Sequence, residues 1–165
     1  YQSWQQFPEA DYYAFVDADG AVSAPELMRM LNCASDSENL DMSFVAVRHF
    51  SGSLTVDRSL LRKATFHFFR ILVRGIVGLR WMDTQCGAKV ISGRSYRAVS
   101  ERLVEDGFVF DVELLATLEQ GAWPVTELPI MWQEIPGSKL RLWRDLWFMT
   151  GGLMRIRRRL NTSDL

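Results

Sequence analysis

The feature that most constrains the fold is a run of five apolar residues that leads directly into an acidic turn. The run, Tyr12 to Val16, is followed by the sequence DADG at positions 17–20. A short apolar run predicts a buried strand, and strands of an α/β sheet deliver polar side chains to a crevice at their carboxyl ends. We therefore expect Asp17 and Asp19 at a functional edge of a sheet rather than in the core.

Strand-like and helix-like segments alternate along the rest of the chain. A capping box with proline in its first turn, SAPE at positions 23–26, predicts a helix to about Leu31. Further strands are expected at 43–47, 89–91 and 125–132, and helices at 59–79, 94–103, 111–119 and about 140–160. This alternation favours an α/β fold with a mixed, mostly parallel sheet and flanking helices. The strand at Tyr12 reads as a central one although no strand pattern precedes it, so we expect the chain to begin within a domain.

Composition favours one globular domain and argues against disorder, because 48% of the 165 residues are hydrophobic and 24% are charged. Cys33 and Cys86 lie far apart without metal-ligand spacing, which predicts neither a zinc site nor a disulfide framework and fits a reducing compartment. No stretch reaches the roughly 20 apolar residues that span a bilayer. If the protein meets a membrane, its residues are expected to lie on the membrane surface and not to cross the bilayer.

The acidic pair is suited to a hard divalent cation, Mg²⁺ or Mn²⁺, which can bridge the oxygens of a diphosphate. An acidic turn that caps a helix has the same local sequence, so both interpretations stay open for Asp17 and Asp19. A second polar segment, DTQCG at 83–87, carries Asp83 and Gln85, which can hydrogen-bond hydroxyl groups, and Gly87, which permits close backbone approach. An aspartate-led turn explains this segment equally well.

Two further segments carry polar groups with more than one interpretation. Asp111 and Glu113 fall in the first turn of a predicted helix, where the helix dipole favours acids. That explanation suffices for at least one of them, and the other could contact a sugar or orient a loop. Ser138 and Lys139, in the sequence PGSK at 136–139, can donate to phosphate, although Pro-Gly-Ser is also ordinary turn chemistry.

Two helices combine basic and apolar residues. The 59–79 helix carries a basic stripe at helical spacing, and the last helix sets aromatic residues beside arginines. The residues are Lys63, His67, Arg70 and Arg74 in the first stripe, and Trp143, Trp147, Phe148, Met154, Arg155, Arg157, Arg158 and Arg159 in the last helix. A solvated face is the commoner meaning of one such stripe. Two in one small domain favour membrane contact, with 1–140 as the main domain, its interfacial helix at about 59–79, and 141–165 as a basic amphipathic helix and tail.

Four motifs in a fixed order carry a resemblance to a known family. They are DADGA at 17–21, DTQCGAK at 83–89, GFVFDVELL at 107–115 and EIPGSK at 134–139. Together they closely resemble the dolichyl-phosphate glucosyltransferase and mannosyltransferase group of family 2 glycosyltransferases, over about residues 11–159, and the glucosyl branch slightly more. Each motif is modest alone, whereas the ordered series is specific.

The resemblance implies a Rossmann-like GT-A fold and inverting transfer of a hexose from UDP-glucose or GDP-mannose to a polyprenyl phosphate. It implies a divalent cation held by Asp17 and Asp19, with Asp83 and Gln85 in catalysis. Because the lipid phosphate is already anionic, positive side chains matter more than a strong base. Arg48 and Arg62 match the family's acceptor-side arginines, Asp111 and Glu113 match substrate-side acids, and Ser138 and Lys139 match a phosphate loop. The sequence departs from the family at 46–47 and at Ala88.

The family's first half, which binds the nucleotide, has no counterpart in the sequence. We therefore expect a partial GT-A domain, a chain that is inactive by itself, and a place on the cytoplasmic face of a membrane through interfacial helices. The alternative function is a non-catalytic membrane-surface binding module with structural acidic loops. Nucleic-acid binding is not expected, because no recognised motif accompanies the basic helices.

Overall fold

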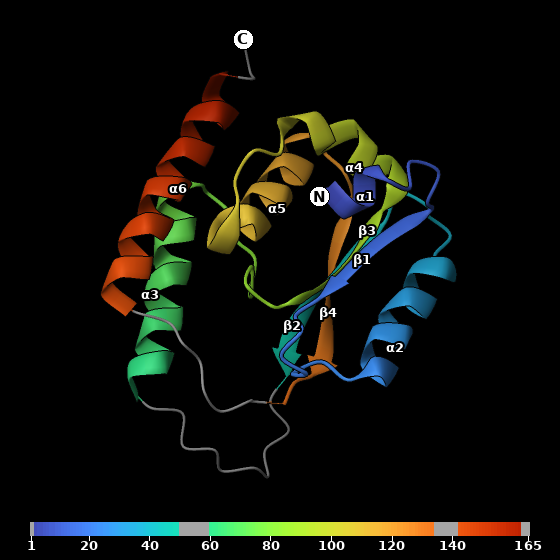
Figure 1. Ribbon diagram of the computed structural model, residues 1–165, viewed down its shortest axis with the longest axis horizontal. Helices are drawn as coiled ribbons and strands as arrows, with labels where there is room; N and C mark the ends of the chain where they lie inside the picture. Colours follow the sequence, from blue (N-terminus) through green and yellow to red (C-terminus); the bar gives the residue numbers. More distant parts are fainter. Residues whose placement is uncertain (1, 50–59, 134–141, 163–165) are drawn as a thin grey trace.

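Four strands form one sheet in the computed structural model, which describes residues 2–49, 60–133 and 142–162 (Figure 1). The strands are β1 (Tyr12–Val16), β2 (Ser43–His49), β3 (Ala88–Ser92) and β4 (Val125–Met131), in the spatial order β1-β3-β2-β4. The α/β class and the position of each predicted strand are confirmed.

The direction of β3 was not predicted. β3 lies between β1 and β2 and is antiparallel to both, whereas β2 and β4 are parallel. The expectation of a mostly parallel sheet is therefore wrong for two of the three pairings. All five residues of β3 are buried, and burial on both faces is typical of parallel strands, so this pattern gave no sign of the antiparallel pairing.

β1 also differs from its prediction as a central strand. Among the described residues it pairs with β3 alone and lies at the end of the sheet. Its aromatic residues are covered by helices instead of by another strand. The Trp4 ring stacks on Tyr13 with centroids 5.2 Å apart, and the Phe110 ring lies 5.2 Å from Phe15.

The predicted helices are present with shifted ends, and one short helix was not predicted. The helices are α1 (Gln2–Gln5), α2 (Ala24–Ser35), α3 (Leu60–Ile76), α4 (Gly93–Val99), α5 (Phe110–Gln120) and α6 (Leu142–Thr162), with 3-10 turns η1 (Ser100–Arg102) and η2 (Gly107–Val109). The predicted cap of α2 is confirmed, because the Ser23 hydroxyl accepts from the backbone N–H of Glu26 at 3.4 Å. α1 has only four residues, too few for a helical repeat of apolar residues that could have predicted it.

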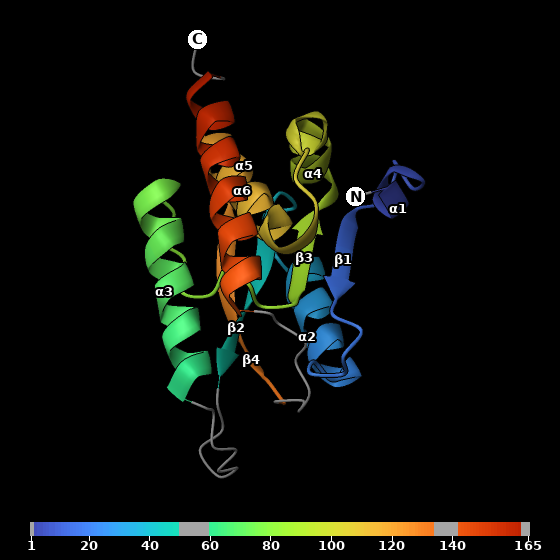
Figure 2. The ribbon, with the colours of Figure 1, turned by 60° about the vertical axis from the view of Figure 1, so that its left-hand side comes forward.

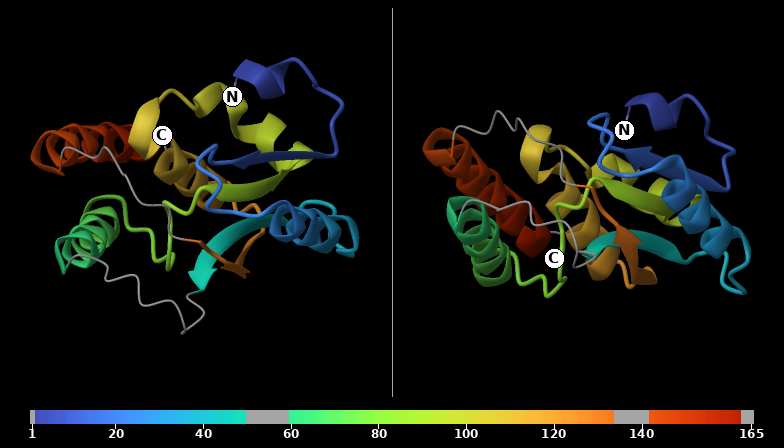
Figure 3. Two further views of the ribbon diagram at one scale, coloured as in Figure 1. Left: turned by 60° about the horizontal axis from the view of Figure 1, so that its bottom comes forward. Right: turned by 90° about the horizontal axis from the view of Figure 1, so that it is seen from below.

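The helices cover the sheet on both faces (Figures 1 and 2). α2 packs on one face over a core that includes Met30, Ala46 and Val90. α5 packs on the other face, where Val45 joins a second core with Leu115. α3 and α6 lie side by side along one flank and run in the same direction (Figure 3).

α6 packs into this second core. Leu153 and Ile156 are buried there. Gly152 lies so close to η2 that a Cβ atom at this position would meet Cγ2 of Val109 at 2.6 Å. No helix among residues 2–49, 60–133 and 142–162 is long and apolar enough to cross a membrane. The predicted domain boundary at 140–141 lies outside the described residues.

A candidate metal and phosphate site at the carboxyl edge of the sheet

The polar residues singled out in the sequence meet at one edge of the sheet. β1, β2 and β4 share a direction, so their carboxyl ends lie together, and the loop before β3 reaches the same edge because β3 runs the opposite way. Asp17 follows β1, Arg48 lies near the end of β2, and Asp83 lies in the loop before β3. Asp111 approaches from the first turn of α5.

Backbone hydrogen bonds hold the acidic loop at this edge. The N–H of Asp17 donates to the carbonyl of Gly87 at 2.8 Å, and the N–H of Ala21 donates to Oδ1 of Asp19 at 2.9 Å. The N–H of Gln133, after β4, donates to the carbonyl of Ala21 at 2.9 Å. Gly20 has a φ of +79°, a conformation that favours glycine. The acidic loop is therefore hydrogen-bonded both to the loop before β3 and to the segment after β4.

The Asp17 carboxylate packs directly on the backbone of Gly87. A Cβ atom at Gly87 would lie 1.9 Å from Oδ2 of Asp17, so the carboxylate could keep its position beside no residue other than glycine. The predicted close approach at Gly87 is thus confirmed. The group that makes this approach is the acidic loop of the chain itself.

Arg48 and Asp83 form a bidentate ion pair. Nε and Nη2 of Arg48 donate to the two carboxylate oxygens of Asp83 at 2.5 and 2.8 Å. The guanidinium also lies 4.9 Å from the ring centroid of Phe66 and 5.3 Å from that of Trp132. Because the Asp83 side chain is only 4% exposed, the guanidinium provides the buried carboxylate with its counter-charge. The two predicted catalytic residues therefore hold each other in place.

A buried lysine completes the charged edge. Lys89 is fully buried, and its Nζ lies 2.8 Å from Oδ1 of Asp111, 2.9 Å from the carbonyl oxygen of Cys86 and 5.2 Å from the Phe15 ring centroid. The approach to Asp111 is an ion pair without good hydrogen-bond alignment, because this buried Oδ1 has no hydrogen-bond partner. Lys89 falls within the DTQCGAK motif, but no role was predicted for it. A charged residue in the middle of an otherwise apolar strand was the available signal.

The pKa values of Asp17 and Asp111 are raised by burial first and by neighbouring carboxylates second. Burial raises the pKa of Asp17 most, Asp19 raises it further, and the charges of Lys89 and Arg48 lower it. Burial also raises the pKa of Asp111, and the opposing effect of Lys89 is followed by smaller increases from Asp17 and Asp83. These carboxylates therefore influence one another electrostatically although they come from three parts of the chain.

Gln85 is held by its own local contacts, and its side-chain amide donates to the carbonyl of Phe108 at 3.0 Å. Its backbone N–H donates to Oδ1 of Asp83 at 3.3 Å, which confirms the predicted aspartate-led turn. The Arg62 side chain, Ser138 and Lys139 lie outside the described residues. Their predicted roles at the phosphates remain predictions.

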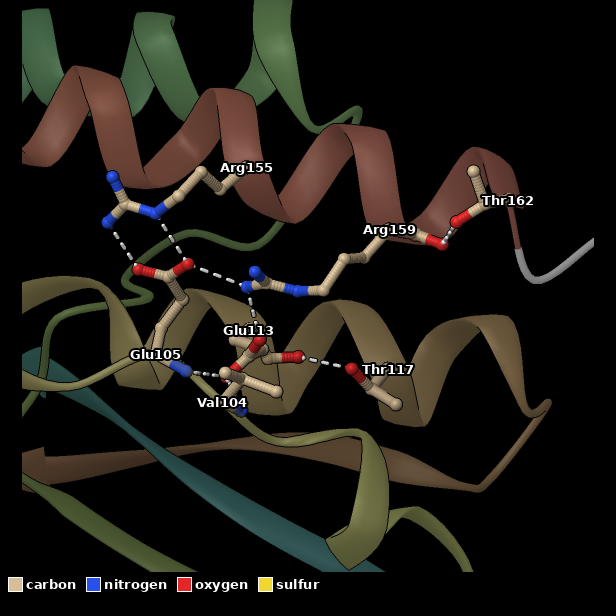
Figure 4. Close-up of polar contacts among 7 residues, drawn as sticks. All are labelled: Val104, Glu105, Glu113, Thr117, Arg155, Arg159 and Thr162. Atoms are coloured by element: carbon tan, nitrogen blue, oxygen red, sulfur yellow. Dashed lines mark hydrogen bonds and ion pairs between the residues drawn. The ribbon is translucent and has the colours of Figure 1, made fainter.

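Glu113 lies in a separate network that connects α5 with α6 (Figure 4). Its Oε2 accepts from the backbone N–H groups of Val104 and Glu105 at 2.8 and 2.7 Å, and its Oε1 accepts from Arg159 at 2.6 Å. Glu105 accepts from Arg155 at 2.9 and 2.6 Å and from Arg159 at 2.7 Å. These contacts match the loop-orienting alternative for Glu113. A contact between Glu113 and substrate remains a prediction.

The described residues contain no cluster of three or more His, Cys, Asp or Glu side chains arranged to hold a metal ion. A cation at Asp17 and Asp19 would need further oxygens from water or substrate. This ligand set is typical of Mg²⁺ sites in which one or two carboxylates act together with substrate phosphates.

Comparisons with known proteins identify the chain as a relative of glycosyltransferases. The particular relatives are dolichyl-phosphate beta-glucosyltransferases. Those of Dictyostelium discoideum and Saccharomyces cerevisiae are 32% and 30% identical over 149 and 157 residues, each covering 88% of this chain. The Drosophila melanogaster protein is 31% identical and covers 76% of the chain. The resemblance inferred from the ordered motifs is thus confirmed.

The chain spans about half the length of these curated relatives, 46% of the first protein and 47% of the second. No family model matches the chain, and no solved structure matches it significantly.

Proposed function

We propose that this chain supplies the metal-binding and acceptor side of a glucosyltransferase. The enzyme would transfer glucose from UDP-glucose to a polyprenyl or dolichyl phosphate with inversion at the sugar carbon. The observation that carries the proposal is the meeting of Asp17 and Asp19 with the Arg48–Asp83 pair at one edge, in a chain related to dolichyl-phosphate beta-glucosyltransferases. The names of these relatives, which are glucosyltransferases, favour glucose over mannose.

The residues at the edge fit a divalent cation because they divide into paired and unpaired carboxylates. Asp83 is paired with Arg48 and Asp111 with Lys89. Among the described residues, no cation contacts the carboxylate of Asp17 or Asp19 within ion-pair distance, so these two would hold the metal. A bound Mg²⁺ or Mn²⁺ would neutralise the donor's diphosphate and stabilise it as a leaving group.

Arg48 would hold the acceptor phosphate near the sugar. An oxygen of the lipid phosphate forms the new bond to the sugar C1 atom, and the bond from C1 to the diphosphate breaks with release of UDP. The attacking oxygen is already anionic, so Asp83 is not needed as a strong base. Its two hydrogen bonds to Arg48 make it a positioning residue that directs the guanidinium.

The test uses the chain expressed with the sequence that flanks it in its gene, because the chain spans only half the length of its relatives. Labelled glucose from UDP-glucose is followed into a lipid fraction with dolichyl phosphate and Mn²⁺. We expect Asp19→Asn to lower kcat/KM at least about a hundredfold, as loss of one preorganised electrostatic group does. The control is Asp36→Asn, the same change at an exposed residue after α2.

Two outcomes would contradict the proposal. One is the absence of glucose transfer and of Mn²⁺-dependent UDP-glucose binding in the wild-type protein. The other is equal activity of the Asp19→Asn and Asp36→Asn proteins.

We further propose that α3 and α6 place the enzyme on a membrane surface. Both helices expose apolar side chains beside basic ones. The exposed residues are Phe68, Ile71, His67, Arg70 and Arg74 on α3, and Trp147, Phe148, Met154, Arg157 and Arg158 on α6. Trp147 is 81% exposed, more than any other large apolar side chain described. Such a surface is suited to anionic lipid headgroups.

Cys33 and Cys86 are free thiols, which suits a reducing compartment, and we therefore propose the cytoplasmic face. Sedimentation with vesicles that contain anionic lipid tests the contact. We expect Trp147→Ala together with Phe148→Ala to reduce binding about tenfold or more, because each ring buries apolar area in the interface. Met28→Ala, at an exposed apolar residue on α2, is the control. Equal binding of both proteins would contradict a membrane role for α6.

A further inference from the structure

We infer that Lys89 is a specificity-determining residue of the metal site: its ammonium neutralises Asp111 and thereby leaves Asp17 and Asp19 to bind a single divalent cation. The inference rests on the proposed metal binding at Asp17 and Asp19. Lys89 itself would touch neither the metal nor the substrate. It would act through the charge that it compensates.

Sheet geometry places Lys89 on the same face as Asp17. Lys89 is the direct partner of Phe15 in the β1–β3 register, and its ammonium lies 5.2 Å from that ring. Side chains two residues apart on a strand point to the same face of the sheet. Asp17 therefore lies on the same face as Phe15, and Gly87 lies on the same face as Lys89. The hydrogen bond from Asp17 to Gly87 keeps this alignment beyond the end of β1.

The first turn of α5 brings Asp111 to this face. Phe110 packs against Phe15, and Asp111 meets the Lys89 ammonium at 2.8 Å. Lys89 therefore contacts the carboxylate held by α5 and shares a sheet face with Asp17 of the acidic loop.

The charges at the edge balance one divalent ion. Among the described residues, four carboxylates meet there, Asp17, Asp19, Asp83 and Asp111, together with two cations, Arg48 and Lys89. Two negative charges remain, which is the charge that one Mg²⁺ or Mn²⁺ neutralises. Without Lys89, Asp111 would add a third negative charge. A third carboxylate would compete with diphosphate oxygens for the cation.

The experiment measures the affinity for Mn²⁺ alone, from the electron paramagnetic resonance signal of the free ion, at neutral pH. The protein is again the chain with its flanking sequence. Asp111→Asn keeps the shape of the side chain and removes one negative charge, so Lys89 becomes an uncompensated cation. We expect the Mn²⁺ affinity to fall about tenfold, because an uncompensated positive charge at the edge repels the incoming cation.

The double variant Lys89→Met with Asp111→Asn separates charge from structural damage. It has the same net charge as the wild type, so we expect its Mn²⁺ affinity to return to within about twofold of the wild-type value. Structural damage would leave the double variant at least as weak as Asp111→Asn, and that result would overturn the inference. Unchanged affinity in Asp111→Asn would also overturn it.

Lys89→Met alone keeps the inference testable if Asp111→Asn does not fold. We expect its Mn²⁺ affinity to equal or exceed the wild-type affinity, because a cation has been removed from the site. A clear decrease would contradict the inference. Asp19→Asn distinguishes this result from failure of the proposed function. Asp19→Asn could lose Mn²⁺ binding while the Mn²⁺ affinities of the Lys89 and Asp111 variants do not follow their net charges. That result would support the metal site and reject only the role of Lys89.

Discussion

Oδ2 of Asp17 lies over the α-carbon of Gly87 so closely that a methyl group there would come within 1.9 Å of it. The contact joins the acidic loop to the loop before β3 and fixes the direction in which the Asp17 carboxylate points. Gly87 is thus required by the site and not by backbone conformation, since its φ is not positive.

We expect Gly87→Ala to displace the Asp17 carboxylate and to reduce metal-dependent binding of UDP-glucose at least about tenfold, because a shift of about 1 Å at a positioned group is costly. Isothermal titration with Mn²⁺ and UDP-glucose measures the effect. Gly75→Ala, in α3, is the matched control because its new methyl group would meet no atom within 4 Å. A Gly87→Ala protein that binds like Gly75→Ala would show that the close contact has no functional role.

The Arg48–Asp83 pair predicts a difference between arginine and lysine. Lys can keep the charge but cannot form two parallel hydrogen bonds, so Arg48→Lys should lower kcat/KM for dolichyl phosphate by about 10- to 100-fold. Arg48→Ala should also destabilise the fold by about 3 kcal/mol, because the buried Asp83 carboxylate loses its partner. Steady-state kinetics and thermal unfolding measure the two effects.

Arg94→Lys is the control for this substitution, because the Arg94 side chain is 63% exposed and lies 3.6 Å from its acidic partner. The pairing has no special geometry, and we expect no measurable change. If Arg48→Lys were as active as Arg94→Lys, the bidentate geometry of the Arg48–Asp83 pair would be irrelevant to glucose transfer.

The network of Glu105 with α6 should make folding stability depend on acid pH. Hydrogen bonds from Arg155 lower the pKa of Glu105 below its usual value of 4.5, more than its burial raises it. A lowered folded-state pKa contributes stability at neutral pH, and this stability is lost as the pH falls from about 4.5 through the folded-state value. Glu105→Gln should cost about 1 to 3 kcal/mol at pH 7 and less at lower pH, as measured by urea unfolding. A constant difference across this pH range would contradict the assignment.

Two adjacent glycines in α6 should respond in opposite ways to alanine. Gly152→Ala places a methyl group 2.6 Å from Cγ2 of Val109 and should destabilise the protein by about 1 to 3 kcal/mol. Gly151→Ala meets only the far end of Arg155, at 3.7 Å, and should stabilise α6 by about 0.5 to 1 kcal/mol. Thermal unfolding of both variants measures the docking of α6 on η2. Equal shifts would mean that this contact contributes nothing.

The sequence predicted the elements better than their arrangement. The strand at Tyr12, the cap at Ser23 and the acidic first turn of α5 depend on local chemistry, and the structure places them as expected. The direction of β3 depends on which strands it joins, and no local pattern encodes such distant pairing. The exposed apolar residues of α3, Phe68 and Ile71, were likewise not predicted to be exposed.

The candidate site was predicted in its residues but not in its contacts. Asp17, Arg48 and Asp83 were named from motifs, and the structure brings them to one edge. Side-chain partners separated by 35 residues, such as Arg48 and Asp83, cannot be read from spacing. Lys89 was missed as a contributor because its importance depends on Asp111, which reaches it only through the packing of α5.

The antiparallel insertion of β3 also affects how the protein can fold. Among the described residues, β1 has no strand partner other than β3, and their pairing joins Tyr12 to Ser92. A ribosome therefore releases the acidic loop well before the strand that fixes it. Such distant pairing is slow to form, and until it forms the apolar residues of β1 can pair with other chains. The acidic loop at positions 17–20 is thus synthesised before β3 but can acquire its final shape only after β3 has been made.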